Sequence, residues 1–128
     1  MASYTYMEPE ELVALLDDPA EAAKLTIVDC RDSDREAEGF ILTSLHLPTA
    51  TSPTAAYTAL AERLAEEGKT TVVFHCALSQ IRGPRGASRF AAVLRDLGRT
   101  VPRVCVLRGG FELFQGMYGK ARPDLMYL

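Results

Sequence analysis

The sequence contains few cysteines and no long apolar run. Its three cysteines, Cys30, Cys76 and Cys105, are odd in number and lack the close spacing of metal ligands, which excludes a disulfide framework and a zinc site. We therefore expect free thiols, reducing surroundings, and no bound metal or cofactor. No apolar stretch approaches the roughly 20 residues that a membrane helix needs, so a membrane-spanning helix is excluded.

Targeting segments, internal repeats and low-complexity tracts are also missing. Residues 1–6 lack the basic and apolar regions of a signal peptide. We therefore expect a protein of the cytoplasm, with the nucleus as the alternative, and no membrane partner. The 128 residues suffice for one hydrophobic core but not for two, so we expect one domain over residues 1–128.

The net charge of −3 hides an uneven distribution of charged residues. Residues 1–68 carry 14 acidic and 4 basic side chains, whereas residues 69–128 carry 3 acidic and 10 basic ones. We expect the basic half to attract anions. Nucleic acid is one such partner, but no recognition motif or aromatic platform accompanies the arginines, so the sequence favours small anions and no nucleic acid.

One short segment, residues 73–84, joins an apolar run to a helix-forming stretch and reads VFHCALSQIRGP. When a loop between a strand and a helix begins with cysteine, its backbone N–H groups and the helix N-terminus can surround an anion. The same positive field stabilises the thiolate, which is the nucleophilic form of cysteine. Cys76 is therefore the predicted nucleophile.

Arg82 ends this loop and brings a planar set of donors that matches two oxygens of a tetrahedral oxyanion. We expect the residues between Cys76 and Arg82 to bind the same anion through their backbone N–H groups. The predicted active-site loop, residues 76–82, consists of Cys76, Ala77, Leu78, Ser79, Gln80, Ile81 and Arg82.

Several of these residues have structural alternatives. Cys76 by itself is also typical of a buried, small apolar residue. His75 should point to the opposite face of its strand from Cys76, which favours a packing or orienting role over that of a base. Ser79 and Gln80 fit either oxyanion donors or turn residues. We expect structural roles for the remaining candidates: a buried Asp29–Arg31 pair, a helix face with Arg85 and Arg89, core side chains Phe111 and Phe114, and an inert Cys105.

Apolar periodicity predicts alternating strands and helices. Helices are expected over residues 9–16, 53–67, 86–97 and 111–114, with a turn or short helix over 33–39. Strands are expected over residues 25–29, 45–48, 70–74 and 101–107. This alternation is typical of an α/β domain with a mostly parallel central sheet flanked by helices. The sites of such sheets lie at the carboxyl ends of strands, where both Cys76 and the 29–31 segment are expected.

The order of several motifs resembles that of rhodanese-fold domains along nearly the whole chain. The motifs are VDCRD at 28–32, GFI at 39–41, the 73–82 segment, and LRGGF at 107–111. In this family, sulfurtransferases usually carry a six-residue loop counted from the cysteine. The dual-specificity, cell-cycle-type phosphatases and the eukaryotic arsenate reductases carry seven residues that end in arginine. The loop from Cys76 to Arg82 has seven, which makes a thiosulfate sulfurtransferase the weakest option.

The flanking segments GPRGASRF at 83–90 and RPDLMYL at 122–128 are similar to those of the trypanosomatid arsenate/antimonate reductases, which also dephosphorylate phosphotyrosine. The resemblance implies a cytosolic enzyme with Cys76 as nucleophile and Arg82 as anion clamp. It also implies glutathione and a glutaredoxin as reductants. The cell-cycle phosphatases often carry a glutamate inside the loop, proposed as proton donor, and residues 77–81 contain none.

These observations lead to one preferred function and two alternatives. The preferred function is thiol-dependent reduction of arsenate or antimonate, with phosphatase activity on aryl phosphates, because phenoxide leaves more easily than an alkoxide without an acid. The alternatives are a protein tyrosine or dual-specificity phosphatase and a non-catalytic rhodanese-like binding module. Cys30 is expected at a neighbouring strand end, and its participation as a second thiol stays open.

Overall fold

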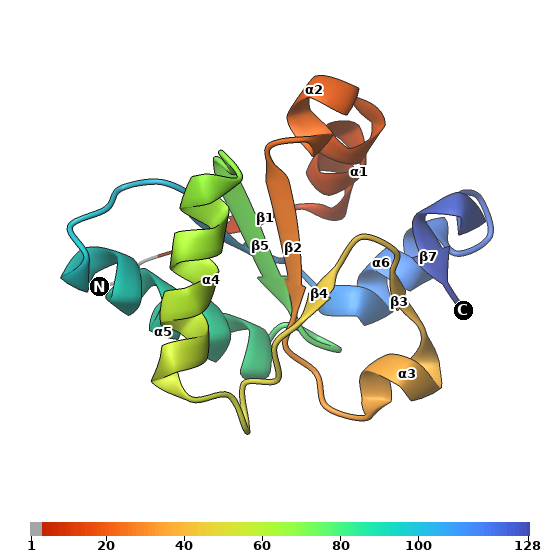
Figure 1. The fold of residues 1–128 in the computed structure, drawn as a ribbon. Coiled ribbons are helices and arrows are strands. Elements are labelled where there is room, and N and C mark those ends of the chain that lie inside the picture. Colours follow the sequence, from red (N-terminus) through yellow and green to blue (C-terminus); the bar gives the residue numbers. More distant parts are fainter. Residues whose placement is uncertain (1–3) are drawn as a thin grey trace.

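A parallel five-stranded sheet forms the centre of the computed structural model, which describes residues 4–128 (Figure 1). The strand order is β1-β6-β5-β2-β4, and every neighbouring pair is parallel. These strands are β1 (Thr5–Met7), β2 (Leu25–Asp29), β4 (Leu45–His46), β5 (Thr71–His75) and β6 (Arg103–Leu107). The predicted α/β fold is confirmed. Residues 1–3, part of the stretch used above to argue against a signal peptide, lie outside the described residues.

Helices cover both faces of the sheet (Figure 1). On one face, α4 (Thr54–Glu66) and α5 (Arg82–Asp96) pack on the strands through a cluster that includes Tyr57, Phe74 and Phe90. On the other face, α1 (Pro9–Asp17) and α6 (Gly110–Tyr118) contribute Leu12, Phe111 and Phe114, which confirms both phenylalanines as core residues. The shorter elements are α2 (Pro19–Ala22), α3 (Asp34–Glu38), η1 (Pro123–Leu125), and the antiparallel strands β3 (Phe40–Ile41) and β7 (Met126–Tyr127).

The main helix after the loop begins four residues earlier than predicted. The sequence predicts a start at Gly86, but α5 begins at Arg82 and includes Gly83 and Pro84 in its first turn. Proline is tolerated there because the first N–H groups of a helix have no partner within the helix. The earlier start brings the helix N-terminus directly beneath the loop. Two other boundaries differ: β6 begins at Arg103 instead of 101, and α6 continues to Tyr118.

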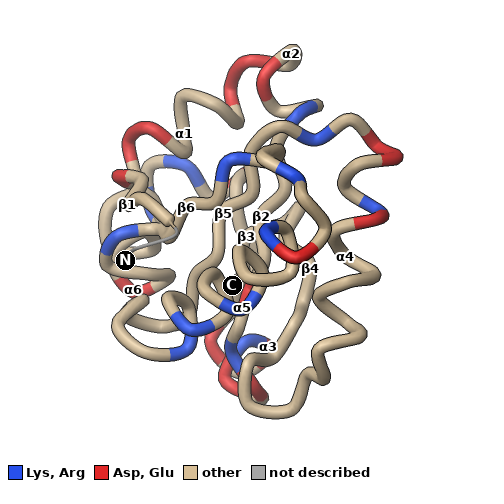
Figure 2. The backbone as a smooth tube through the Cα atoms, turned by 90° about the vertical axis from the view of Figure 1, so that its left-hand side faces the viewer, with Lys and Arg blue, Asp and Glu red and all other residues tan. Residues whose placement is uncertain are grey.

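The uneven charge distribution is largely balanced in space. Arg82, Arg99, Arg108 and Arg122 of the basic half each form an ion pair with an acidic side chain of the first half. Figure 2 shows basic and acidic segments interspersed over the backbone. The expected cationic field is therefore weaker than the residue counts indicate. Within residues 4–128, none of the helices has both the length and the apolar character that crossing a membrane takes.

Candidate active site

The predicted loop lies where the central strand β5 ends and α5 begins. It surrounds a hollow of about 150 Å³, lined by Cys76, Ala77, Leu78, Gln80, Ile81 and Arg82. Cys76 lies at its base and is 3% exposed. Six of the seven predicted loop residues therefore share one small hollow. Leu78 and Ile81 are exposed beside it.

The backbone around Cys76 is arranged to hold negative charge. The Gly83 N–H, in the first turn of α5, donates a hydrogen bond to the Cys76 sulfur at 3.2 Å. The helix N-terminus adds a partial positive charge at the same place. Both contacts favour a thiolate and an adjacent oxyanion over a neutral thiol.

Ser79 shapes the loop from below. It is the described non-glycine residue with a positive φ, 56°, and its side chain is buried. The Cys76 N–H donates to the Ser79 hydroxyl at 3.4 Å. Of the two readings of Ser79, the turn residue is the one that this geometry supports, whereas Gln80 lines the hollow.

Arg82 faces two carboxylates that sequence reasoning missed. Its guanidinium donates to both oxygens of Asp34, at 3.1 and 2.9 Å, and to one oxygen of Asp32 at 3.4 Å. The hydrogen bond to Asp34 raises the pKa of Arg82, and the same bond lowers the pKa of Asp34. Both acids follow β2, whose carboxyl end adjoins that of β5, and this position was the available signal.

A buried ion pair braces the loop from the opposite face of the sheet. The Arg31 side chain donates to both oxygens of Asp29, at 3.0 and 2.7 Å, and both residues are fully buried, as predicted. Burial alone would raise the pKa of Asp29, but the hydrogen bonds and charge of Arg31 lower it. The His75 ring lies against the same carboxylate, 3.9 Å from one oxygen.

His75 links this ion pair to the loop. Its Nδ1 is 3.1 Å from the Cys76 carbonyl oxygen, which fits an Nδ1–H donor. Burial lowers the pKa of His75, so the neutral ring is favoured. Phe111 N–H of α6 donates to the same carbonyl at 2.9 Å. The predicted orienting role of His75 therefore agrees with its position.

Two further contacts hold the start of α5. The Thr49 hydroxyl donates to the Arg82 carbonyl at 2.8 Å, and the Arg89 guanidinium donates to the Thr49 carbonyl at 3.2 Å. Arg89 also stacks on the Tyr57 ring, 4.3 Å from its centroid. Arg89 thus belongs to a helix face beside the hollow, as predicted, and Arg85 on the same helix is exposed.

The other two cysteines are buried. Burial raises the pKa of the Cys30 thiol to about 12, which argues against Cys30 as a second reactive thiol at neutral pH. Cys105 belongs to the apolar cluster on the face of the sheet opposite Cys76, where an inert thiol was predicted. All three thiols are free, as expected.

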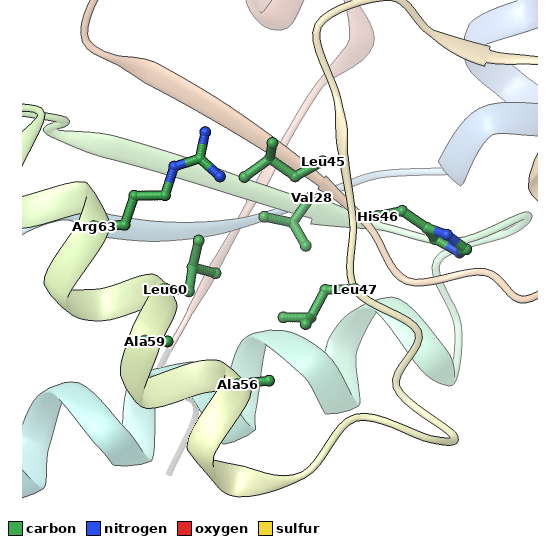
Figure 3. Close-up of a pocket in the computed structure, with 8 residues that line it drawn as sticks. All are labelled: Val28, Leu45, His46, Leu47, Ala56, Ala59, Leu60 and Arg63. Carbon is green, nitrogen blue, oxygen red and sulfur yellow. The ribbon is translucent and has the colours of Figure 1, made fainter.

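A second hollow, of about 310 Å³, lies between α4 and the edge strand β4 (Figure 3). Its wall is mostly aliphatic, and Figure 3 shows Leu45, Leu47 and Leu60 pointing into the space while His46 points away. No nucleophile lines it. The chemistry therefore belongs to the smaller hollow over Cys76.

The fold and the site define a cysteine-dependent, oxyanion-binding α/β domain. The chain belongs to the family of rhodanese-like domains, whose model matches residues 8–117. Its sequence is 35% identical over 115 residues to arsenate reductase 2.2 of Oryza sativa subsp. japonica, which covers 84% of this chain and 79% of that protein.

Two solved structures extend this similarity over almost the full chain. The As-Sb reductase of Leishmania major is 53% identical, with a TM-score of 0.95 over 98% of this chain and 86% of that one. A yeast protein tyrosine phosphatase of the rhodanese family is 29% identical, with a TM-score of 0.82 over 100% of this chain and 96% of that one. The resemblance to reductases and phosphatases of this fold is confirmed.

Proposed function

We propose that this protein is a thiol-dependent arsenate/antimonate reductase with phosphatase activity on aryl phosphates. The observation that carries the proposal is the Cys76 sulfur at the base of an anion-sized hollow, with the Gly83 N–H and Arg82 around it. The 53% identity to the Leishmania major enzyme supports arsenic and antimony oxyanions as substrates.

The first chemical step is attack by the Cys76 thiolate on the oxyanion centre. A sulfur–arsenic or sulfur–phosphorus bond forms, and one oxygen leaves with its electron pair. Backbone N–H groups of residues 77–83 and the free donors of Arg82 hold the remaining oxygens as charge develops on them. With a phosphate ester, water then hydrolyses the phosphocysteine.

With arsenate, a small thiol completes the reaction. Its sulfur attacks the Cys76 sulfur, the sulfur–arsenic bond breaks, and that electron pair stays on arsenic, which leaves as arsenite. A mixed disulfide remains, and a second thiol reduces it to restore Cys76. We propose glutathione and a glutaredoxin as these reductants and the cytoplasm or nucleus as the location, because thiols stay reduced there.

A reduction assay tests this proposal. Purified protein with glutathione and glutaredoxin should convert arsenate to arsenite, inorganic phosphate should compete, and Cys76→Ser should abolish turnover. Cys105→Ala is the matched control, because it removes a buried thiol from the opposite face of the sheet, and it should keep turnover. Arsenite formation that is equal in wild type and Cys76→Ser would contradict the proposal.

A protein tyrosine phosphatase is the second candidate, which the similarity to the yeast enzyme favours. The ratio of kcat/KM for arsenate to that for a phosphotyrosine peptide separates the two functions. The non-catalytic module is tested by alkylation: a Cys76 that reacts no faster than free cysteine would support it.

A further inference from the structure

Two carboxylates lie beside the guanidinium that is proposed to clamp the substrate. Asp34 accepts hydrogen bonds from both terminal nitrogens of Arg82, and Asp32 accepts one from Nη1. Negative charge at this position repels an incoming oxyanion, so these residues weaken substrate binding. Their presence beside an anion site therefore needs another explanation.

The hydrogen bonds leave one edge of the guanidinium available. The Nη1 hydrogens point to Asp34 and Asp32, and one Nη2 hydrogen points to Asp34. The Nε hydrogen and the second Nη2 hydrogen remain, and these two parallel donors match two oxygens of an oxyanion. Arg82 can therefore bind an anion and keep both carboxylates next to it.

The two carboxylates differ in how firmly they are held. Both oxygens of Asp34 accept from Arg82, and Oδ1 also accepts from the Asp32 N–H at 2.9 Å. Such a group stays ionised. Asp32 contacts Arg82 through Oδ2 alone, at 3.4 Å, and its side chain is 44% exposed against 26% for Asp34. Asp32 is therefore the carboxyl group that is free to carry a proton.

The loop itself offers no proton donor of this kind. Residues 77–81 are ALSQI and contain no carboxyl group, and the ring of His75 is turned to the other side of the strand, against Asp29. Asp32 and Asp34 are the carboxylates that contact the loop arginine. A proton for the leaving oxygen has to come from this side of the hollow or from water.

We infer that Asp32 donates the proton to the leaving oxygen when the Cys76 thiolate attacks. This inference rests on the proposed function. The sulfur–phosphorus or sulfur–arsenic bond forms, the bond to the leaving oxygen breaks, and the proton moves from Asp32 to that oxygen. The leaving group departs as a phenol or, from arsenate, as water. With a phosphate ester, Asp32 then takes a proton from the water that hydrolyses the phosphocysteine.

Substrates with different leaving groups test the inference. Phenoxide, with a pKa near 10, needs a proton more than the weakly basic 4-nitrophenoxide does. For Asp32→Asn, we expect kcat on phenyl phosphate to fall about 100-fold and kcat on 4-nitrophenyl phosphate to fall less than about 5-fold. Arsenate reduction should fall at least as far as phenyl phosphate hydrolysis, because hydroxide is the most basic leaving group.

Asp34→Asn is the matched control, since it also removes one negative charge bonded to Arg82. Both variants should bind inorganic phosphate about threefold or more tightly, because each loses a repelling charge. Only Asp32→Asn should change the ratio of the two aryl phosphate rates. Asp32→Glu should restore part of that ratio, and circular dichroism should show that all variants are folded.

The possible outcomes separate the inference from the proposed function. Equal losses on both aryl phosphates in Asp32→Asn, or equal ratios in Asp32→Asn and Asp34→Asn, would overturn the role of Asp32 and leave the function intact. A wild-type protein that turns over neither arsenate nor aryl phosphate would overturn the function and the role of Asp32 with it.

Discussion

The contact between α6 and the active-site loop leads to a prediction about Gly110. This residue begins α6 with φ of 63°, and an added Cβ would lie 2.4 Å from the Ala77 carbonyl oxygen and 2.6 Å from the Cys76 carbonyl oxygen. Both neighbours are backbone atoms, so neither can move without moving the loop. Gly110→Ala should therefore destabilise the fold and displace the nucleophile together.

Two other glycines separate the contributions to this effect. Gly68 has φ of 69° with no atom within 4 Å of its added Cβ, so Gly68→Ala tests backbone strain alone and should cost about 1–2 kcal/mol. Gly116, inside α6, also has no atom within 4 Å, and Gly116→Ala should stabilise by about 0.5–1 kcal/mol. Gly110→Ala combines strain with overpacking of about 1–3 kcal/mol, which gives about 2–5 kcal/mol in all.

Urea unfolding and the rate of Cys76 alkylation measure the two consequences. At about 3–5 °C per kcal/mol, the Tm should fall further in Gly110→Ala than in Gly68→Ala. Under conditions where each variant is folded, alkylation and arsenate turnover should fall only in Gly110→Ala. The reasoning is refuted if Gly110→Ala is no less stable than Gly68→Ala, or if it keeps full activity.

Two more predictions concern the buried groups behind the loop. Asp29→Asn leaves the buried Arg31 charge without a counter-ion and should cost about 3–5 kcal/mol in urea unfolding, whereas Asp17→Asn, at an exposed pair with Arg122, should change little. His75 has a lowered pKa, so below about pH 6.5 the unfolded chain binds a proton that the folded chain does not, and stability should decrease as pH falls, by up to about 1.4 kcal/mol per pH unit. His75→Asn should flatten this dependence between pH 7 and 5, and an unchanged slope would contradict it.

The strands at the centre of the sheet could be predicted because their residues reveal burial locally. Residues 25–29 and 71–75 are short apolar runs with β-branched side chains, and β2 and β5 occupy nearly those ranges. The shortest strands, β1, β3 and β7, have two or three residues each and were missed. Such segments form through pairing with distant residues, such as Thr5 with Cys105, and carry no periodicity of their own.

The residues around the loop divide in the same way. Cys76 and Arg82 could be predicted because both lie in one continuous segment of seven residues, whose local geometry brings them together. Asp34 is 48 residues from Arg82 in the chain, and Thr49 is 33, so no local pattern links them. The approach of Gly110 to Ala77 likewise depends on where α6 packs.

The sequence by itself determined the alternation of strands and helices, the family resemblance and the nucleophile with its arginine, because each is a property of consecutive residues. Only the tertiary structure decided which charges meet. It brought acidic residues of the first half to basic residues of the second and set two carboxylates against Arg82. The physical reason is that charge interactions depend on distance in space, which the order of parallel strands sets and the count of charges along the chain does not.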